Sequence, residues 1–408
     1  MMGNAFTLTV DQEGIGSLVF DLPGEKVNKF SPTVVHEFEQ ILDKLGKSND
    51  LKALVISSAK PGIFIAGADI NVIETLNSED AALEAARTGH QVFNKLANLP
   101  FPTIALIDGA CLGGGLEMAL ACDFRIVTDN PKTKLGLPEV NLGIIPGWGG
   151  TQRLPELIGL SQSLPMILAG KAIDSKKAWK THLADALVSA EFKNEQARAY
   201  VVQWLTPEGR RQALERRKQC GMMNCLLERN PIGRKLIFKK AREGLMAKTG
   251  GHYPAPVAAL DVIEGSHGRA TDRGFKSEQT RFADLARSGI SKNLIKVFFT
   301  SEDLKKEGNI ARQATQRPIR SVAVLGGGVM GGGIAWLMSK GDIPVRIKDV
   351  NWDGVAKGFQ QANSVYSKLV EIRKLQKFEL RQKMHRITGT LDYTGFKKHD
   401  LIVEAIVE

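Results

Sequence analysis

The sequence is poor in several features that define whole classes of protein. Its 408 residues include only four cysteines and 6% aromatic residues, and no apolar run approaches membrane-spanning length. The cysteines have no CxxC spacing, so we expect neither a disulfide framework nor a metal site. The N-terminus lacks the basic stretch and apolar core of a secretory signal. Together these absences predict a cytoplasmic protein with reduced thiols.

Positive charge is abundant and unevenly distributed. The formal net charge is +11, and basic residues outnumber acids between Arg210 and Lys248. A solvated helix face is the simplest interpretation of this region. The alternatives are attraction of acidic substrates such as phosphate-bearing thioesters, a protein partner, or peripheral contact with a membrane. We do not expect nucleic-acid binding, because no aromatic-studded basic motif accompanies the charge.

The order of predicted elements divides the chain into three parts. Strands alternate with helices over residues 1–190, which predicts an α/β domain. Strand signals become rare over residues 191–310, so this part is expected to be a helical connector or a second helical layer. A polar stretch then precedes a new buried strand, and residues 311–408 are expected to form a further domain. Within the first domain we predict two strands in 5–20, helices at 32–47 and 78–99, and strands at 52–58 and 103–108.

A glycine-rich joint in the first domain is the strongest candidate for a site. Gly113-Gly114-Gly115 lies between a predicted strand and a helix, where the first-turn N–H groups are free. Such a joint either binds an oxyanion or allows tight packing. Glu117 follows in the helix among apolar neighbours, and Glu139 is also surrounded by apolar residues. Desolvation would raise the pKa of Glu139, and two glutamates can share the acid–base work of adding water to a double bond.

Four segments resemble the crotonase (enoyl-CoA hydratase/isomerase) family: FIAGADI at 64–70, GACLGGGLE at 109–117, LGLPE at 135–139 and PGWGGTQRL at 146–154. The resemblance implies a crotonase-type β/α superhelix that binds a coenzyme A thioester. It implies that the amides of Ala68 and Gly114 hold the thioester oxygen, and that Glu117 and Glu139 are the catalytic pair. In hydratases of the family this pair adds water; in isomerases Glu139 alone moves a proton.

Three features depart from the usual pattern of the family. The spacing from Glu117 to Glu139 is two residues longer than in single-function hydratases, a form familiar from the α-subunits of fatty-acid oxidation complexes. Asn71 stands where many members carry a lysine for the coenzyme A phosphates, so Lys26 or the basic helices would serve instead. Trp148 is bulkier than usual; it either narrows the acyl pocket or simply packs.

A second glycine-rich motif opens the last domain. The segment SVAVLGGGVMG at 321–331 follows the pattern of a strand, a glycine turn and a helix that binds a dinucleotide. Gly326 would allow the turn, Gly328 the approach of a pyrophosphate, and Gly331 close packing of helix on strand. Asp349, about twenty residues further on, would bind the ribose hydroxyls, and its charge favours NAD over NADP.

The same region resembles the NAD-binding half of 3-hydroxyacyl-CoA dehydrogenases. The resemblance implies a partial Rossmann domain and places Asp303 near the hydroxyacyl substrate. The catalytic histidine and acidic partner of that family lie downstream of this sequence, so we expect a truncated dehydrogenase that does not oxidise the hydration product. The residues implied to line the NAD cofactor are Met330, Ile406, Val407 and Glu408.

The order of parts along all 408 residues resembles the multifunctional α-subunits of fatty-acid oxidation complexes. This implies hydration of trans-2-enoyl-CoA to 3-hydroxyacyl-CoA in β-oxidation, with a thiolase β-subunit as partner. Two alternatives stay open. One is another crotonase reaction, such as Δ3-Δ2-enoyl-CoA isomerisation; the other is a scaffold subunit that mainly holds the thiolase.

Overall fold

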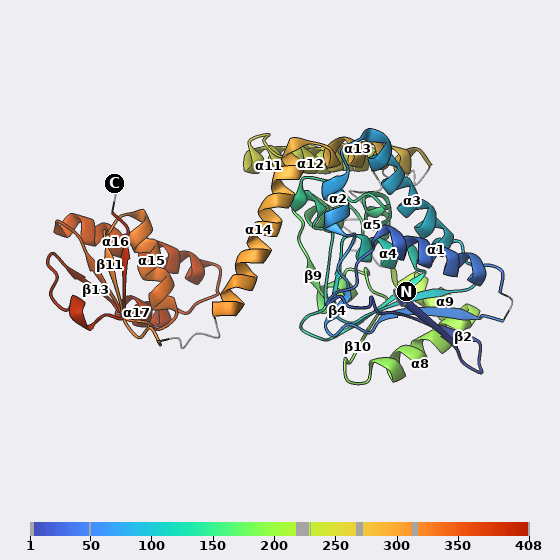
Figure 1. The fold of residues 1–408 in the computed structure, drawn as a ribbon, viewed down its shortest axis with the longest axis horizontal. Helices are drawn as coiled ribbons and strands as arrows, with labels where there is room; N and C mark the ends of the chain where they lie inside the picture. The colour runs from blue at the N-terminus through green and yellow to red at the C-terminus, as the bar shows by residue number, and fades with distance from the viewer. Residues whose placement is uncertain are drawn as a thin grey trace. The chain divides into compact units, whose positions relative to one another are not determined.

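The computed structural model describes residues 4–48, 50–217, 228, 230–266, 272–311 and 317–406. Contacts within the chain group it into two compact units, Met1–Asp303 and Leu304–Glu408 (Figure 1). No helix within the described ranges is both long and apolar enough to cross a membrane.

A six-stranded sheet forms the base of the first unit, as far as the chain is described. Its order is β1-β2-β3-β5-β7-β10; β1 and β2 are antiparallel, and the other neighbours are parallel. Strands β5 and β7 are buried throughout, as expected for parallel strands covered on both faces. The strands are β1 (Phe6–Val10), β2 (Ile15–Phe20), β3 (Ala53–Ser58), β5 (Thr103–Ile107), β7 (Phe124–Thr128) and β10 (Ala186–Val188).

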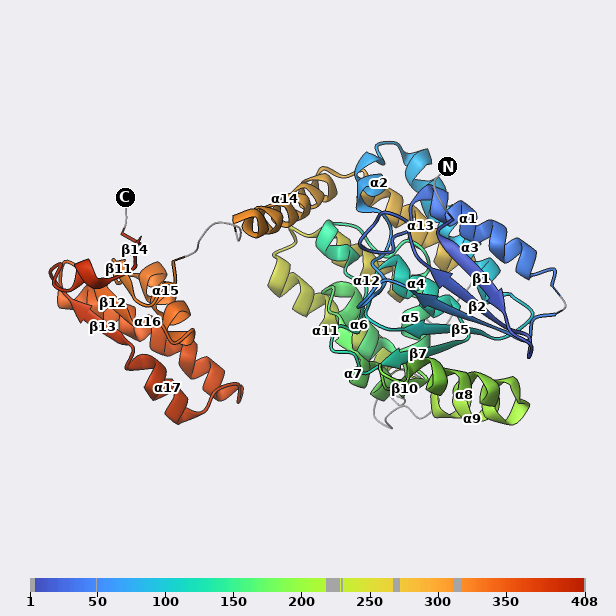
Figure 2. The same cartoon turned by 60° about the horizontal axis from the view of Figure 1, so that its bottom comes forward.

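Helices cover both faces of this sheet. One face packs in a large core against α1 (Pro32–Leu45), α3 (Glu79–Ala97) and α4 (Gly114–Ala121). The opposite face packs in a smaller core, where Phe124 stacks on Trp204 with ring centroids 4.4 Å apart. Trp204 belongs to α8 (Lys193–Leu205), which lies beside α9 (Pro207–Arg217) under β7 and β10 in Figure 2.

A second sheet runs alongside the first and positions the glycine-rich joint. In the described chain its order is β4 (Ile63–Ile65), β6 (Ala110–Leu112), β8 (Lys134–Gly136) and β9 (Ile173–Asp174). Strands β4, β6 and β8 are parallel and follow β3, β5 and β7 along the chain. Each turn of the chain therefore adds one strand to each sheet, which confirms the predicted crotonase-type superhelix.

The described residues of the stretch predicted as a helical connector are mostly helical, and part of the stretch completes the first core. Ala259, Ile263 and Phe282 are buried in that core, and α13 packs along α3 (Figure 1). The limits at 190 and 310 stay predictions. The remaining helices of this part of the fold are α2 (Ile70–Thr75), η1 (Glu139–Leu142), α5 (Gly150–Ile158), α6 (Leu160–Leu168), α7 (Ser175–Lys180), α11 (Pro231–Thr249), α12 (Pro254–Ser266), α13 (Asp272–Ala286) and α14 (Gly289–Ala311).

Several arginines of the basic region form hydrogen bonds and ion pairs with other parts of the same chain. Arg216 donates to the carbonyl oxygens of Asp185 and Trp179, and its guanidinium lies over the Trp179 ring. Arg217 pairs with the buried Asp185 carboxylate, with 2.7 Å between Nε and Oδ1. Arg242 of α11 pairs with two acids of α12. These arginines join helices to the fold, so the solvated face expected from the sequence is only part of their role.

The second unit contains, in its described residues, a four-stranded parallel sheet in the order β13-β12-β11-β14. Its strands are β11 (Val322–Leu325), β12 (Val345–Lys348), β13 (Ile387–Thr390) and β14 (Leu401–Glu404). Helices α15 (Val329–Lys340), α16 (Trp352–Glu371) and α17 (Lys377–Met384) and the short η2 (Phe396–Lys398) accompany them. The succession β11-α15-β12 is the strand–helix–strand unit of a Rossmann domain, as predicted.

Candidate active site and nucleotide-binding loop

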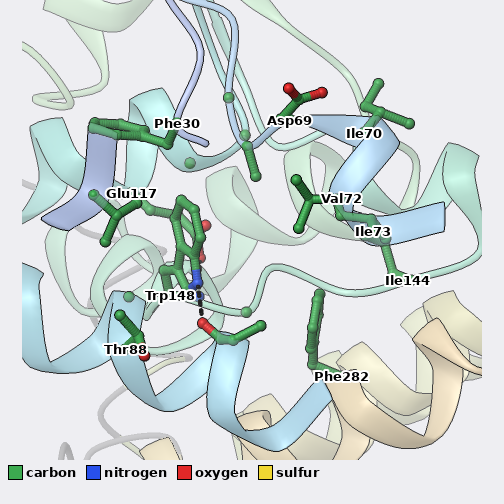
Figure 3. A pocket seen from close by; sticks show the side chains of 18 of the residues that line it. Phe30, Asp69, Ile70, Val72, Ile73, Thr88, Glu117, Ile144, Trp148 and Phe282 are labelled. Atoms are coloured by element: carbon green, nitrogen blue, oxygen red, sulfur yellow. Dashed lines mark hydrogen bonds between the residues drawn. The ribbon is translucent and has the colours of Figure 1, made fainter. Parts of the chain in front are cut away.

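A cavity of about 410 Å³ lies within the first unit (Figure 3). Residues of α1, α2, α3, α4, η1 and α13 line it, so segments far apart in the sequence meet here. Of the described residues on its wall, Glu117 and Glu139 are the two buried carboxylates. Most of the wall is apolar, and its apolar side chains include Phe30, Ile70, Val72, Ile73, Ile144, Trp148 and Phe282.

The glycine-rich joint turns the chain from β6 into α4. Gly113 has φ +52° and ψ −128°, a conformation that side-chain-bearing residues rarely adopt. A Cβ added to Gly113 would lie 3.0 Å from Oε1 of Glu139, so a side chain here would also crowd that carboxyl group. Gly114 is the first residue of α4, where an amide has no partner within the helix. The joint thus leaves an amide open on the cavity wall.

The amides of Ala68 and Gly114 lie close together. A Cβ added to Gly114 would be 3.3 Å from the Ala68 nitrogen. The two neighbours of Ala68 are both bonded to Phe30. The Phe30 N–H donates to the Gly67 carbonyl oxygen, and the Asp69 N–H donates to the Phe30 carbonyl oxygen. Neither the Ala68 nor the Gly114 amide donates to any other described residue. Two free N–H groups side by side on a cavity wall are what a developing oxyanion requires.

Glu117 is held in place by the loop that follows η1. Its side chain extends from α4 and is 2% exposed, and its Oε1 accepts the N–H groups of Trp148 and Gly150, each at 2.8 Å. Burial raises the pKa of this carboxyl well above its ordinary value, and repulsion from Glu139 and Glu278 adds to the rise. The two N–H bonds oppose that rise because they favour the charged form.

Glu139 is the less restrained of the two acids. It is the first residue of η1, and its buried Oε2 has no hydrogen-bond partner among the described residues. Burial raises the pKa of Glu139 to about 8; the bond to its own backbone N–H opposes this rise, and repulsion from Glu278 adds to it. A pKa raised in this way favours the protonated form of Glu139, beside the glycine-rich joint, at neutral pH.

Trp148 packs against neighbouring aromatic rings and also narrows the cavity, so both of the roles considered from the sequence apply. Its indole N–H donates to the Ala85 carbonyl oxygen at 3.1 Å, and its ring meets Phe30 and Phe93 edge to face. A Cβ added to Gly114 would be 2.7 Å from the ring. The indole thus lies directly beside one of the two free amides.

Three contributors to the site were missed by the sequence reasoning, and all lie on helices α13 and α14. Phe282 lines the cavity, Glu278 binds the loop after η1, and Lys292 binds the end of α2. These helices carry no glycine motif. Their only sequence signal was an acid at a buried position of an amphipathic helix. Asp303 is exposed on α14 and is not among the residues that line the cavity.

The glycine-rich loop of the second unit has the shape of a dinucleotide site. Gly326 has φ +97°, and a Cβ added there would be 2.5 Å from the Ala405 carbonyl oxygen. A Cβ at Gly331 would collide with the Gly326 carbonyl. By contrast, no described atom lies within 4 Å of a Cβ added to Gly328, which caps the N-terminus of α15. The residues present therefore fit a pyrophosphate approaching the open end of this helix.

Asp349 follows β12 and faces the same loop. Its Oδ2 accepts the Gly327 N–H at 2.7 Å, and this bond is the main cause of a lowered pKa. Its Oδ1 accepts the Val350 N–H at 2.6 Å, so the backbone fixes the carboxylate beside the loop, where it could accept a ribose hydroxyl. Met330 and Ile406 are exposed, as cofactor-contacting residues must be. Val407 and Glu408 lie outside the described residues.

Family comparisons agree with this geometry. Residues 11–222 match the enoyl-CoA hydratase/isomerase family, and residues 321–408 match the 3-hydroxyacyl-CoA dehydrogenase NAD-binding domain. The chain therefore belongs to the enoyl-CoA hydratase/isomerase family, and its second unit carries an NAD-binding domain.

Among curated relatives, the fatty acid oxidation complex subunits alpha of Vibrio parahaemolyticus and Vibrio vulnificus are each 40% identical, over 406 and 405 residues. Each match covers 99% of this chain and 56% of the relative, so the chain spans about half the length of these relatives. A solved enoyl-CoA hydratase from Mycobacterium avium subsp. paratuberculosis shares the fold, with a TM-score of 0.50 and 16% identity over 72% of this chain and 98% of that one.

Proposed function

We propose that the cavity of the first unit hydrates trans-2-enoyl-CoA to 3-hydroxyacyl-CoA in fatty acid β-oxidation. The observation that carries this proposal is the meeting of two buried carboxylates, Glu117 and Glu139, with the free amides of Ala68 and Gly114 on one mainly apolar wall. Membership of the enoyl-CoA hydratase/isomerase family supports it, as do the names of the relatives.

The hydrogen bonds favour one division of labour between the two acids, because two N–H groups donate to Glu117 whereas Oε2 of Glu139 has no described partner. Glu117, held by two N–H donors, accepts a proton from water as the water oxygen bonds to C3 of the substrate. The π electrons of the conjugated thioester shift onto its oxygen, where the Ala68 and Gly114 amides stabilise the negative charge. Glu139 then delivers its proton to C2 as the enolate collapses. Proton exchange with solvent restores both acids.

Crotonyl-CoA hydration by the purified chain tests the proposal, followed as loss of the absorbance of the conjugated thioester. Glu117→Gln and Glu139→Gln should each lower kcat by about 10²- to 10⁴-fold with the fold retained by circular dichroism. Glu228→Gln is the matched control, because Glu228 also accepts two backbone N–H groups but does not line the cavity. Wild-type rates in both active-site variants would rule out this function.

For the second unit we propose NAD as the cofactor, bound with its pyrophosphate at Gly328 and a ribose at Asp349. Met330 and Ile406 are proposed to line the cofactor, together with Val407 and Glu408, and Asp303 to lie near a hydroxyacyl substrate. NAD, when bound, would supply a hydride acceptor. The relatives are nearly twice as long as this chain. We therefore propose oxidation of the 3-hydroxyacyl product only for a protein as long as these relatives.

We further propose a thiolase β-subunit as partner and the cytoplasm as location. The relatives are named as subunits of a complex, which supports a partner. Cys111 and Cys122 are free thiols, which fits a reducing compartment. The partner is tested by co-purification of this chain with a thiolase from the same cells; elution of the two proteins in separate peaks would argue against the complex.

A further inference from the structure

Glu278 is a buried carboxylate that the proposed reaction leaves without a role. It lies on α13 with 0% exposure. It accepts the Gly149 N–H at 2.6 Å, the Thr151 N–H at 3.0 Å and the Thr151 hydroxyl, and Nε2 of His90 is 2.9 Å from its Oε1. The three hydrogen bonds from Gly149 and Thr151 are all donated to Glu278, so both of its oxygens act as acceptors, as those of a carboxylate do.

Glu278 and Glu117 hold the same loop from two sides. The N–H groups of Trp148 and Gly150 point to Glu117, whereas those of Gly149 and Thr151 point to Glu278. Successive amides thus alternate between the two carboxylates. A displacement of Glu278 would therefore displace the donors that fix Glu117.

The charge of Glu278 also acts on both proposed catalytic acids. After burial, its repulsion is among the causes that raise the pKa of Glu117 and of Glu139. Two basic groups face this cluster. Arg153 of α5 donates to the Trp148 carbonyl oxygen at 2.9 Å, and burial lowers the pKa of its guanidinium. His90 of α3 lies beside Glu278, with its ring edge-on to a phenylalanine of α13.

We propose that Glu278 is a positioning residue for hydration, which fixes the loop that holds Glu117 and places a carboxylate on the other side of that loop from Glu117. This inference rests on the proposed function, because hydration is the reaction that uses the carboxyl group of Glu117. It gives α13 a chemical role, since the helix supplies a charge to a site whose acids come from α4 and η1.

Two variants of Glu278 separate the effect of its charge from the effect of its side-chain length. Glu278→Gln keeps the size and removes the charge, so both limbs of the pH–rate profile for crotonyl-CoA hydration should move to lower pH by about one pH unit. Its kcat should fall about tenfold, because an amide nitrogen cannot accept from the loop. Glu278→Asp keeps the charge and withdraws the carboxylate, so kcat should fall several-fold while both limbs stay in place.

Glu228→Gln is again the matched control, because Glu228 accepts two backbone N–H groups and one hydroxyl, as Glu278 does, but away from the cavity. Its rate and both limbs should match the wild type. Unshifted limbs in a folded Glu278→Gln variant would overturn the inference. If that variant does not fold, Glu278→Asp decides the matter, and a wild-type kcat in this variant would overturn the positioning role.

Infrared spectroscopy separates the inference from the proposed function, because it needs no turnover. The carbonyl stretch of a protonated carboxyl, assigned by its loss in Glu117→Gln or Glu139→Gln, should persist to higher pH in the wild type than in Glu278→Gln. A band with the same pH dependence in both proteins would contradict the inference. A shifted band in a protein that does not hydrate crotonyl-CoA would contradict the proposed function alone.

Discussion

The indole of Trp148 occupies the space that a side chain at Gly89 would need. A Cβ added to Gly89 would collide with the indole ring, and one turn earlier on α3 the Ala85 carbonyl accepts the indole N–H. The absence of a side chain at Gly89 thus lets the pyrrole part of the indole approach α3 closely. The ring forms a fixed wall of the cavity next to Gly114.

Shortening Trp148 should shift activity toward longer acyl chains. Trp148→Ala would open space beside the Gly114 amide, so the ratio of kcat/KM for a long-chain 2-enoyl-CoA to that for crotonyl-CoA should rise about tenfold or more. Trp148→Phe should give a smaller rise, because an aromatic ring remains. Steady-state kinetics with a series of chain lengths measures the effect.

Stability must be separated from specificity in that experiment. Removing a large aromatic side chain from a core costs about 3–5 kcal/mol, depending on how far the neighbouring residues can close the space that it leaves. Trp204→Phe is the control, because Trp204 is buried in the core on the opposite face of the main sheet. It should lower stability without changing chain-length preference. An unchanged preference in a folded Trp148→Ala variant would leave Trp148 with a packing role only.

Glu139 should make the protein less stable as the pH rises. Its ordinary pKa of 4.5 is raised to about 8 in the fold, so between these values the unfolded chain is ionised while the folded protein keeps its proton. Stability therefore falls through this pH window and levels off above it. Glu139→Gln should be the more stable protein at pH 8, by a few kcal/mol, with little difference at pH 4.5. Urea denaturation at several pH values measures this, and parallel curves for variant and wild type would contradict it.

Lys292 should support the α2 wall of the cavity. From α14 its Nζ donates to the carbonyl oxygens of Ile73, Glu74 and Leu76, at 3.1, 2.6 and 2.9 Å. Lys292→Met removes these bonds from the end of α2, so we expect a loss of about 1–3 kcal/mol in stability and a KM that rises more than kcat falls. Lys296→Met, at an exposed position one turn later, is the matched control. Equal KM values for the two variants would count against this support.

Asp349 should select the dinucleotide. Its lowered pKa keeps it ionised at neutral pH, so it would repel the 2′-phosphate of NADPH and accept from the ribose of NADH. Asp349→Ser should weaken NADH binding about tenfold or more and reduce the preference over NADPH. Fluorescence titration of the chain with each dinucleotide measures both effects. Asp353→Ser, exposed at the start of α16, is the control; an identical NADH affinity in the two variants would remove Asp349 from the site.

Local patterns predicted much of the fold. The helix expected at 32–47 is α1, the strand expected at 52–58 is β3, and the helix expected at 78–99 is α3. Each has a clear apolar periodicity and, for the helices, a serine N-cap: Ser31 for α1 and Ser78 for α3. The short strands of the second sheet were not predicted, because β4, β6 and β8 have three residues each and lie within glycine-rich turns.

The four motifs and the family resemblance that they carry also led to Glu117, Glu139, Ala68 and Gly114, which the fold does bring to one cavity. Glu278 could not be found in this way. Its partners on the loop are more than 120 residues away in the sequence, and a single acid in a helix has no periodicity or spacing that marks it. Contacts of this range follow from packing of helices, which a single sequence does not encode as a local pattern.

The dependence of the site on α13 and α14 bears on how the hydratase can be isolated. A protein ending at residue 190, or at the family match limit of 222, would contain both proposed acids and both oxyanion amides. It would lack Phe282 from the cavity wall, Glu278 from the loop and Lys292 from the end of α2. The smallest piece expected to work on its own therefore extends through α13 into the first turn of α14, even though the motif residues end at 154.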